Sequence, residues 1–369
     1  MKFEIQKAVL ESVLSKARSV LATKDLVPIL KNFNVTASAG MLCVVATDLA
    51  LSVVAKTGMV NCIEAGQAIF PGNKFIDIVK TCEESPVVVS VEDDVAVIVC
   101  AGATWNVSLQ SFEAYPDIPD VGEVEVTYFA KELFHNALNK VKGAAAKEGV
   151  RPALQMVDIL NGDVRASDGA MFRQVHVPEL VGVSMQIPLG AVEDLVKLLR
   201  GTEAEKIGFG QTKDHLLFVI GEDVFIVTKN NVEYPDVEES LLGPARNNKQ
   251  SLVVNREQLI NGVRRVRVNA DEDTKGVTLT LKQDYLSLSA RDKRGNDANE
   301  TIEAKYNSPS GTNDRSLTVN HITLVDALTV VDSLTVEFML GVDTRQRKAP
   351  VFIEEGDTAV VLQTLKLAL

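Results

Sequence analysis

The fold is decided by the stretch KFEIQKAVLESVLSKA at residues 2–17, because its pattern occurs three times along the chain. An extended segment at residues 2–5 is followed by apolar residues at positions i, i+3, i+4 and i+7, namely Leu10, Val13, Leu14 and Ala17. This spacing places four side chains on one face of a helix. The stretch therefore predicts a strand that is followed directly by an amphipathic helix.

The pattern returns in the middle third and in the last third of the 369 residues. Residues 124–127 precede Phe134, Ala137, Leu138 and Val141, and residues 251–254 precede Leu259, Gly262, Val263 and Val266. The repeat of about 124 residues far exceeds a solenoid unit, so each copy can form a domain with its own core. We predict three domains, at residues 1–123, 124–248 and 249–369.

Each third also contains a second apolar stripe with helical spacing, at residues 75–82, 192–199 and 324–331. Between and after the helices lie runs of Val, Ile and Leu that are separated by turn residues, as in residues 86–109. Such runs are typical of antiparallel meanders. The predicted fold class is α+β, with three tandem domains that each pack two helices on antiparallel sheets.

Two short signatures support the alignment of the thirds. The first comprises Ala46-Thr47-Asp48, Ala166-Ser167-Asp168 and Ala290-Arg291-Asp292, and the second comprises Tyr115-Pro116-Asp117 and Tyr234-Pro235-Asp236. Proline cannot donate to a sheet ladder and biases the residue before it to extended geometry. We therefore expect the Tyr-Pro pairs to mark strand ends that lead into linkers between domains.

The sequence contains no recognisable catalytic motif. The four histidines are scattered without the spacing of a zinc site, and phosphate-loop, dinucleotide and nucleophile-elbow motifs are absent. The four cysteines, Cys43, Cys62, Cys82 and Cys100, form no Cys-x-x-Cys pair. Cys82 lies on a predicted apolar helix face and Cys43 and Cys100 lie in apolar strand runs, so we interpret the cysteines as buried thiols rather than metal ligands. We expect no enzymatic activity, no cofactor and no metal.

Composition indicates a folded protein with 46% hydrophobic residues. No apolar run approaches the roughly 18 residues that a membrane span needs. The chain enters a strand pattern at Lys2 without the apolar region of a signal peptide. We expect a cytoplasmic protein that has no membrane partner.

Charge is distributed unevenly along the chain. The net charge of −12 alone argues against binding to nucleic acid, yet the predicted helical regions hold 16 Lys or Arg against 9 Asp or Glu. One explanation is that Lys and Arg are good helix formers on solvated faces. The other is an arc of domains whose inner helices attract a phosphate backbone without reading bases. Because only 5% of the residues are aromatic, duplex fits such a surface better than stacked single strands.

Several short segments resemble the bacterial DNA polymerase III beta subunit, the sliding clamp. They are Met1-Lys2-Phe3, Val27-Pro28-Ile29-Leu30, Thr47-Asp48-Leu49, Ser167-Asp168-Gly169, Tyr234-Pro235-Asp236 and Leu365-Lys366-Leu367. The resemblance covers the whole chain in order. It implies a head-to-tail homodimer whose six domains form a closed ring around double-stranded DNA. Such a ring is loaded by a clamp loader and tethers the replicative DNA polymerase at high local concentration.

The resemblance also implies a cleft between the second and third domains that binds short peptide motifs of partner proteins. Its residues here would be Arg151, Leu154, Ser167, Gly169, Ala170, Met171, Phe172, Pro235, Ser240, Leu241, Val361, Leu362, Leu365, Lys366 and Leu367. An alternative interpretation of Met171 and Phe172 is ordinary strand core.

Some positions depart from the family pattern. Ala170 and Met171 stand where the family usually has His or Tyr and then Arg, and Gln363-Thr364 replaces a usual Met-Pro. Tyrosines that often follow the position of Arg151 are replaced by Pro152 and Ala153. These differences suggest a divergent clamp with dedicated partners, of bacterial or phage origin.

The resemblance assigns two further surfaces. Residues expected to face DNA are Lys24, Lys74, Lys140, Lys147, Lys197 and Arg264. The dimer contact is expected to join Val107 of the first domain to Val268, Asn269 and Asp273 of the third, so that unpaired strand edges at both ends are covered. The rival hypothesis is a three-domain scaffold that binds protein or peptide and does not encircle DNA.

Overall fold

The computed structural model describes residues 1–21, 27–118, 124–149, 151–230, 232–236, 241–247, 249–308, 314–341 and 350–365. Internal contacts divide the chain into two compact units. The first unit comprises Met1–His135 and Gly190–Asn230, and the second comprises Asn136–Leu189 and Asn231–Leu369. Both predicted domain boundaries, at residues 123 and 248, fall outside the described residues and stay a prediction.

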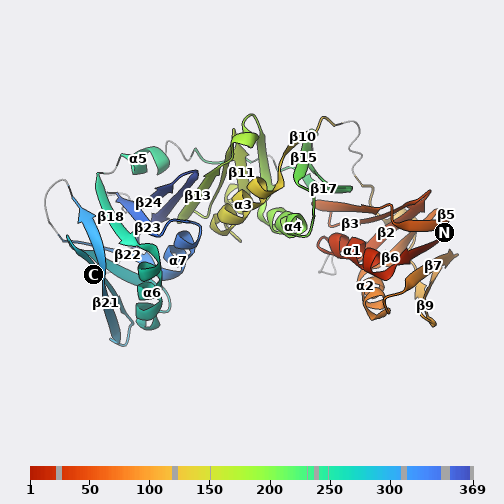
Figure 1. Ribbon diagram of the computed structural model, residues 1–369, viewed down its shortest axis with the longest axis horizontal. Helices are drawn as coiled ribbons and strands as arrows, with labels where there is room; N and C mark the ends of the chain where they lie inside the picture. The colour runs from red at the N-terminus through yellow and green to blue at the C-terminus, as the bar shows by residue number, and fades with distance from the viewer. Residues whose placement is uncertain are drawn as a thin grey trace. The chain divides into compact units, whose positions relative to one another are not determined.

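The first unit contains two antiparallel sheets (Figure 1). The smaller sheet has the order β5-β1-β7-β8-β9 and the larger has the order β10-β15-β16-β17-β4-β3-β2-β6. The strands are β1 (Lys2–Gln6), β2 (Asn32–Ser38), β3 (Met41–Thr47), β4 (Leu51–Thr57), β5 (Val60–Glu64), β6 (Gly66–Pro71), β7 (Pro86–Glu92), β8 (Val95–Cys100), β9 (Ala103–Ser108), β10 (Thr127–Ala130), β15 (Lys206–Gln211), β16 (His215–Ile220) and β17 (Asp223–Thr228).

The second unit contains one sheet of twelve strands, in the order β14-β11-β12-β13-β25-β24-β23-β18-β21-β20-β19-β22. The strands are β11 (Met156–Leu160), β12 (Asp163–Ser167), β13 (Met171–His176), β14 (Ser184–Pro188), β18 (Gln250–Asn255), β19 (Gly276–Leu281), β20 (Tyr285–Arg291), β21 (Asp297–Asn307), β22 (Arg315–Asn320), β23 (Thr335–Leu340), β24 (Pro350–Glu355) and β25 (Thr358–Gln363). Among the described residues, every pairing in this sheet is antiparallel.

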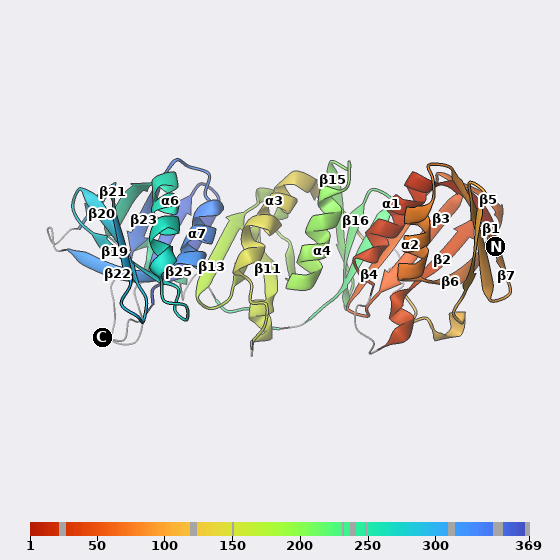
Figure 2. The same ribbon diagram turned by 90° about the horizontal axis from the view of Figure 1, so that it is seen from below.

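The helices confirm the predicted stripes. They are α1 (Lys7–Arg18), α2 (Gly72–Thr81), α3 (Lys131–Val141), α4 (Leu189–Arg200), α5 (Gly243–Arg246), α6 (Arg256–Val266) and α7 (His321–Thr329). The four predicted apolar positions of α1, of α3 and of α6 are all buried. In the first unit α1 and α2 pack side by side on the sheets, and in the second unit α6 and α7 do the same (Figure 2).

Short 3-10 helices connect several strands and helices. They are η1 (Pro28–Lys31), η2 (Phe112–Ala114), η3 (Lys142–Ala144), η4 (Pro152–Gln155), η5 (Pro178–Leu180) and η7 (Arg267–Asn269). Two of the long helices have side-chain caps, because Asn255 accepts from the backbone N–H of Gln258 and Asn320 from that of Ile322. No helix in the described part of the chain is long and apolar enough to cross a membrane.

Three local predictions need correction. The strand predicted at residues 124–127 begins at Thr127, because the ladder with β15 runs from Thr127 opposite Phe209 to Ala130 opposite Lys206. Residues 243–246, just before the domain boundary predicted at residue 248, do not form an extended linker but α5, whose Ala245 is fully buried. The Tyr-Pro pairs lie beyond the strand ends, and Tyr115 is anchored by its hydroxyl, which donates to the carbonyl of Val45 at 3.1 Å.

The Thr-Asp and Ser-Asp signatures mark equivalent turns between strands. Asp48 Oδ1 accepts the backbone N–H groups of Ala50 and Leu51 between β3 and β4. Asp168 Oδ1 accepts those of Ala170 and Met171 between β12 and β13. Side-chain capping of successive N–H groups is the ordinary role of aspartate in a tight turn. The first two thirds therefore share the same backbone conformation at this point.

Candidate nucleic-acid and partner surfaces

Exposed cations lie on the long helices of both units. Lys74 on α2 and Lys197 on α4 are exposed in the first unit. Arg264 on α6 and Lys147, in the segment after η3, are exposed in the second unit. Lys24, another predicted DNA-facing residue, lies outside the described residues, so its assignment stays a prediction. Three candidates, Lys74, Lys147 and Arg264, have no ion pair with any residue that the structure describes, so their full charge is available to a ligand.

The other two candidate cations are ion-paired. Lys140 Nζ lies 2.8 Å from Asp332 Oδ2, and Lys197 Nζ lies 2.9 Å from Asp194 Oδ1. In each pair one of the two side chains is largely exposed, and surface ion pairs contribute about 0–1 kcal/mol, so a phosphate can compete with the carboxylate. Lys140 and Lys197 are therefore weaker candidates than the unpaired cations.

The predicted basic character does not extend to α7. This helix has no Lys or Arg, and it contributes Asp326 instead. The Asp326 carboxylate accepts a hydrogen bond from the guanidinium of Arg173 on β13. The acidic residue therefore has a structural partner, and α7 is the exception among the long helices.

Among the described residues, two strand ladders join different thirds of the chain, and the second of them holds part of the candidate cleft. In the first unit β4 pairs with β17, with Val53 opposite Phe225, and we call this ladder the first seam. In the second unit β13 pairs with β25, with Arg173 opposite Val360, and we call this ladder the second seam. The predicted cleft residues 167–172 and 361–362 lie on the second seam and on the turn that precedes it.

The larger predicted cleft side chains are buried. Phe172 and Val361 pack in one cluster with Leu242, Ala245, Phe352 and Ala359, and Leu241 and Met339 are partly buried against it. Met171, Leu362 and Leu154 are also buried. The alternative interpretation of Met171 and Phe172 as strand core therefore agrees with their positions. These side chains support a surface rather than form its outer layer.

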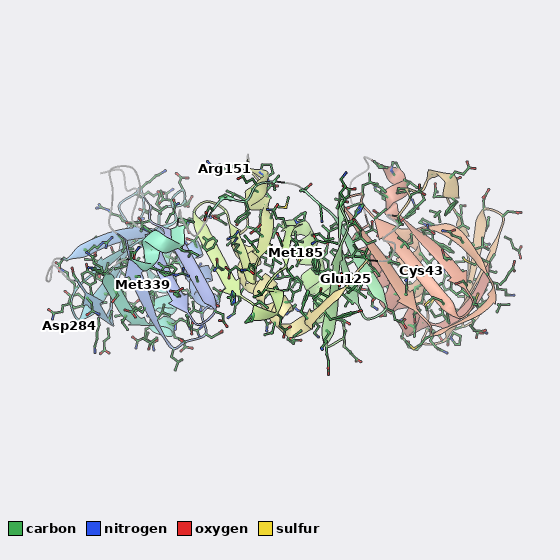
Figure 3. The ribbon with its side chains drawn as sticks, turned by 90° about the horizontal axis from the view of Figure 1, so that it is seen from above. Cys43, Glu125, Arg151, Met185, Asp284 and Met339 are labelled. Carbon is green, nitrogen blue, oxygen red and sulfur yellow. The ribbon has the colours of Figure 1, made fainter. Side chains whose placement is uncertain are left out.

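The outer layer of the candidate cleft is made of smaller or polar groups. Arg151, before η4, is exposed (Figure 3), as are Gly169, Ala170 and Pro235. Ser167 is buried, and its hydroxyl donates to the carbonyl of Met171 at 2.8 Å. Because Gly169 has a φ of +90°, glycine suits this turn, and a Cβ there would lie 3.8 Å from Leu154 Cδ1.

The tail after β25 approaches a different strand. The backbone N–H of Leu365, which is half-buried, donates to the carbonyl of Thr318 on β22 at 2.7 Å. Ser240, Lys366 and Leu367 lie outside the described residues, so these three cleft assignments stay predictions. The structure brings together Leu154, the turn at residues 167–172, Leu241 and β25.

The predicted dimer residues differ in exposure. Val268 on η7 is 80% exposed, whereas Val107 on β9 is 3% exposed. Asn269 Nδ2 donates to the carbonyl of Asp297 at 2.8 Å, and Asp273 pairs with Lys293. The Val107 side chain is part of the core and is not available to a second chain, whereas one edge of β9 has no ladder partner among the described residues.

Sequence reasoning missed a buried polar contact beneath the cleft. Arg173 is 2% exposed, and its guanidinium contacts Asp326 and the backbone carbonyl of Lys140. Burial lowers the pKa of the Arg173 guanidinium, and the nearby Asp326 carboxylate opposes that shift. The sequence signal was a lone arginine within a strand of otherwise apolar or neutral residues. We find no cluster of metal-ligating residues in the described part of the chain.

Comparisons with known proteins agree with this architecture. Solved structures of the DNA polymerase III subunit beta from Pseudomonas aeruginosa (TM-score 0.89, 21% identity) and of the sliding clamp from Bartonella birtlesii bound to griselimycin (TM-score 0.89, 22% identity) each cover 100% of both chains. A solved Pseudomonas aeruginosa clamp is also bound to griselimycin (TM-score 0.87, 22% identity, full coverage of both chains). The fold is thus the three-domain clamp fold.

Sequence comparisons define the family. Models of the N-terminal and C-terminal domains of the DNA polymerase III beta subunit match residues 1–119 and 244–361, which together cover more than half of the chain. The beta sliding clamp of Haemophilus influenzae is 25% identical over 324 residues (83% of this chain, 85% of the relative). That of Pseudomonas aeruginosa is 22% identical over 377 residues and covers both chains fully. The chain belongs to the DNA polymerase III beta subunit family of bacterial sliding clamps.

Proposed function

We propose that two copies of this chain join head to tail in a closed ring around double-stranded DNA and tether the replicative DNA polymerase to its template. The observation that carries the proposal is the set of exposed cations in both units that have no ion pair among the described residues, in a chain whose fold matches a solved clamp over its whole length. The role is mechanical and needs no catalytic residue or cofactor. We place it in the cytoplasm, with a clamp loader opening the ring and proteins that carry clamp-binding motifs as further partners.

Unpaired strand edges support ring closure. In the described residues, β9 forms a ladder only with β8, at one edge of its sheet. Residues 297–303 of β21 likewise form a ladder only with β20. An open edge presents unpaired N–H and C=O groups that favour pairing with another chain. Pairing β9 of one copy with β21 of the next would satisfy both edges and close a two-fold ring.

The cations support DNA contact that does not depend on sequence. Lys74, Lys147 and Arg264 are exposed, and long cationic side chains attract phosphates by releasing counterions. These three side chains form no fixed two-pronged set of hydrogen-bond donors that would recognise a particular base. Loose electrostatic contact is what a protein that slides along DNA requires.

The surface above the second seam supports partner binding. Small exposed residues, Gly169 and Ala170, lie beside a buried apolar cluster that includes Phe172 and Val361. A short peptide could bury an apolar side chain there, with Arg151 orienting its polar end. Griselimycin is bound to the Pseudomonas aeruginosa and Bartonella birtlesii clamps. We propose that it also binds this chain, on the surface above the second seam, and we use it below as a probe of that surface.

Retention on circular DNA tests the proposed function. The clamp, loaded onto nicked circular DNA, should co-elute with it and should be released when the circle is cut, because a topological link is lost at a free end. Release on linearisation at constant ionic strength would separate encirclement from ordinary binding. A protein that binds circular and linear DNA equally, or neither, would instead fit the rival scaffold.

Removing the unpaired cations should weaken the electrostatic contact with DNA. For Lys74→Ala, Lys147→Ala and Arg264→Ala combined, the slope of log K against log salt should fall by about 0.9 for each lost phosphate contact. The sequence preference should not change, because no base contact is removed. Fluorescence anisotropy of a short duplex at several salt concentrations measures both quantities.

A matched variant removes the same charge from the sheets. Lys2 on β1, Lys213 before β16 and Lys305 on β21 are exposed, so Lys2→Ala, Lys213→Ala and Lys305→Ala lower the net charge equally. This control should retain nearly the wild-type salt slope. Equal losses in the two triple variants would contradict a DNA-facing helix surface and indicate an effect of net charge alone.

A further inference from the structure

The two seams are built from equivalent parts of the repeat. Val53 on β4 and Arg173 on β13 each follow the aspartate of the preceding turn by five residues. Asp48 and Asp168 cap those turns with the same pair of hydrogen bonds. The two seams can therefore be compared position by position within one chain.

The helices over the two seams are equivalent too. Lys16 is the tenth residue of α1, and Lys140 is the tenth residue of α3. Asp194 is the sixth residue of α4, and Asp326 is the sixth residue of α7. Each seam thus has a helix carbonyl and a carboxylate at matching places.

The first seam borders a half-open cavity. Its volume is about 470 Å³, and its lining includes Val53, Phe225, Lys16 and Lys197. The carboxylate of Asp194 is paired with Lys197 at 2.9 Å. Burial raises the pKa of Asp194, and Lys197 opposes that shift. The short side chain of Val53 leaves this space unfilled.

The second seam is filled at the equivalent place by Arg173. Its Nη1 donates to the carbonyl of Lys140 at 2.9 Å, and its Nη2 donates to Asp326. A Cβ at Gly143 would lie 3.1 Å from Nη1 and 3.4 Å from Asp326 Oδ2, so the surroundings are closely packed. The arginine thus connects β13, the end of α3 and α7.

Arg173 also contacts the cleft from below. Its Nη2 lies 3.5 Å from the sulfur of Met171, which is the first residue of β13 after the exposed turn at residues 168–170. Fixing Met171 fixes one end of that turn. A binding surface that is already ordered loses less conformational freedom when its ligand binds.

We propose that Arg173 is the positioning residue of the partner cleft, because it fills the second seam and connects it through Asp326 to α7. The first seam has Val53 at the equivalent position and no such connection through that residue, so its strands separate more readily. The inference rests on the proposed partner-binding function. It assigns to Arg173 no contact with the partner itself. The role is to hold β13 and β25 in the arrangement that the partner recognises.

Exchanging the residue types of the two seams tests this inference. Arg173→Val gives the second seam the side chain of the first. Val53→Arg gives the first seam the side chain of the second, and there Asp194, which is paired with Lys197, takes the place of Asp326. Amide hydrogen exchange along β13 and β25 reports on the seam, and calorimetric titration with griselimycin reports on the cleft. Asp326→Asn removes the ion pair while keeping side-chain volume, and serves where Arg173→Val does not fold.

Arg173→Val and Asp326→Asn should each accelerate exchange in β13 and β25 by about tenfold or more, as expected when a local contact is lost. Griselimycin should bind about tenfold more weakly, mainly through faster dissociation. Arg173→Lys should retain more of the affinity than Arg173→Val, because lysine keeps the charge but lacks the planar guanidinium that donates through both Nη1 and Nη2. Val53→Arg should slow exchange in β4 and β17 and leave griselimycin affinity unchanged.

Two results would overturn the inference. One is an amide hydrogen exchange rate in β13 and β25 of folded Arg173→Val that equals the wild-type rate. The other is a loss of griselimycin affinity in Val53→Arg that is as large as the loss in Arg173→Val. If the wild-type clamp does not bind griselimycin, the proposed cleft fails while the exchange measurement still decides the role of Arg173. The two proposals therefore fail separately.

Discussion

Val268→Asp is expected to convert the dimer into a monomer and to abolish retention on circular DNA. The Val268 side chain is 80% exposed in the single chain, beside the open edge of β21 at residues 297–303. Burying an unpaired carboxylate at an interface costs about 3–5 kcal/mol, which weakens association by roughly two to four orders of magnitude. Native mass spectrometry would then show the 40.0 kDa chain alone at concentrations where the wild type is a dimer.

The matched control is Val181→Asp. Val181 follows η5 and is 59% exposed, and no predicted surface includes it. The same substitution there should leave the dimer and its retention on circular DNA intact. A stable Val268→Asp dimer that still remains on circular DNA would place the contact between copies elsewhere.

The repeated helices were predictable because each one buries a continuous stripe. The spacing of Leu10, Val13 and Leu14 allows one helical face to reach the core, and α1 buries all three. Local spacing is a property of adjacent residues, so no long-range information was needed. The start of β10 was predicted three residues early for the opposite reason. Its first ladder residue is set by its partner β15, about 80 residues away, and not by the alternation of Val124 and Val126.

The candidate site was predictable only in part. The turn at residues 167–172 carries a local signature, and the structure places it on the second seam as a capped turn. The contact of Arg173 with Asp326 joins residues 153 positions apart, and no local pattern pairs them. The burial of Phe172 likewise depends on α5 and β24, which lie far along the chain. The sequence alone does not distinguish side chains that contact a partner from side chains that pack beneath them.

Net charge was also an incomplete guide. The helices of the first unit carry cations on solvated faces, but Lys16 and Lys197 are each paired with a carboxylate. The pairing of Lys16 with Asp223 connects α1 to a strand of the middle third, which counting charges along the sequence could not show. Geometry therefore reduces the candidate DNA contacts to the cations that remain unpaired among the described residues.

Phe172→Ala is expected to destabilise the second seam and to remove partner binding together. Phe172 is 1% exposed and lies among Leu242, Phe352 and Val361, so truncation leaves a cavity between β13, β25 and α5. Loss of a buried phenylalanine side chain costs about 3–5 kcal/mol of unfolding free energy. The midpoint of thermal unfolding should fall, and griselimycin binding should become undetectable in calorimetry, because the base of the cleft is lost.

Phe112→Ala is the control for the loss of an aromatic ring. Phe112 on η2 is 54% exposed, so its removal should change stability by no more than about 0.5 kcal/mol. Differential scanning calorimetry of both variants separates a packing effect from a general effect of losing phenylalanine. If Phe172→Ala keeps the stability and the griselimycin affinity of the wild type, the cluster collapses around the smaller side chain. The second seam would then not depend on the Phe172 ring. A loss of affinity without a loss of stability would instead mean that Phe172 contacts the ligand directly, with the strands parting to admit it.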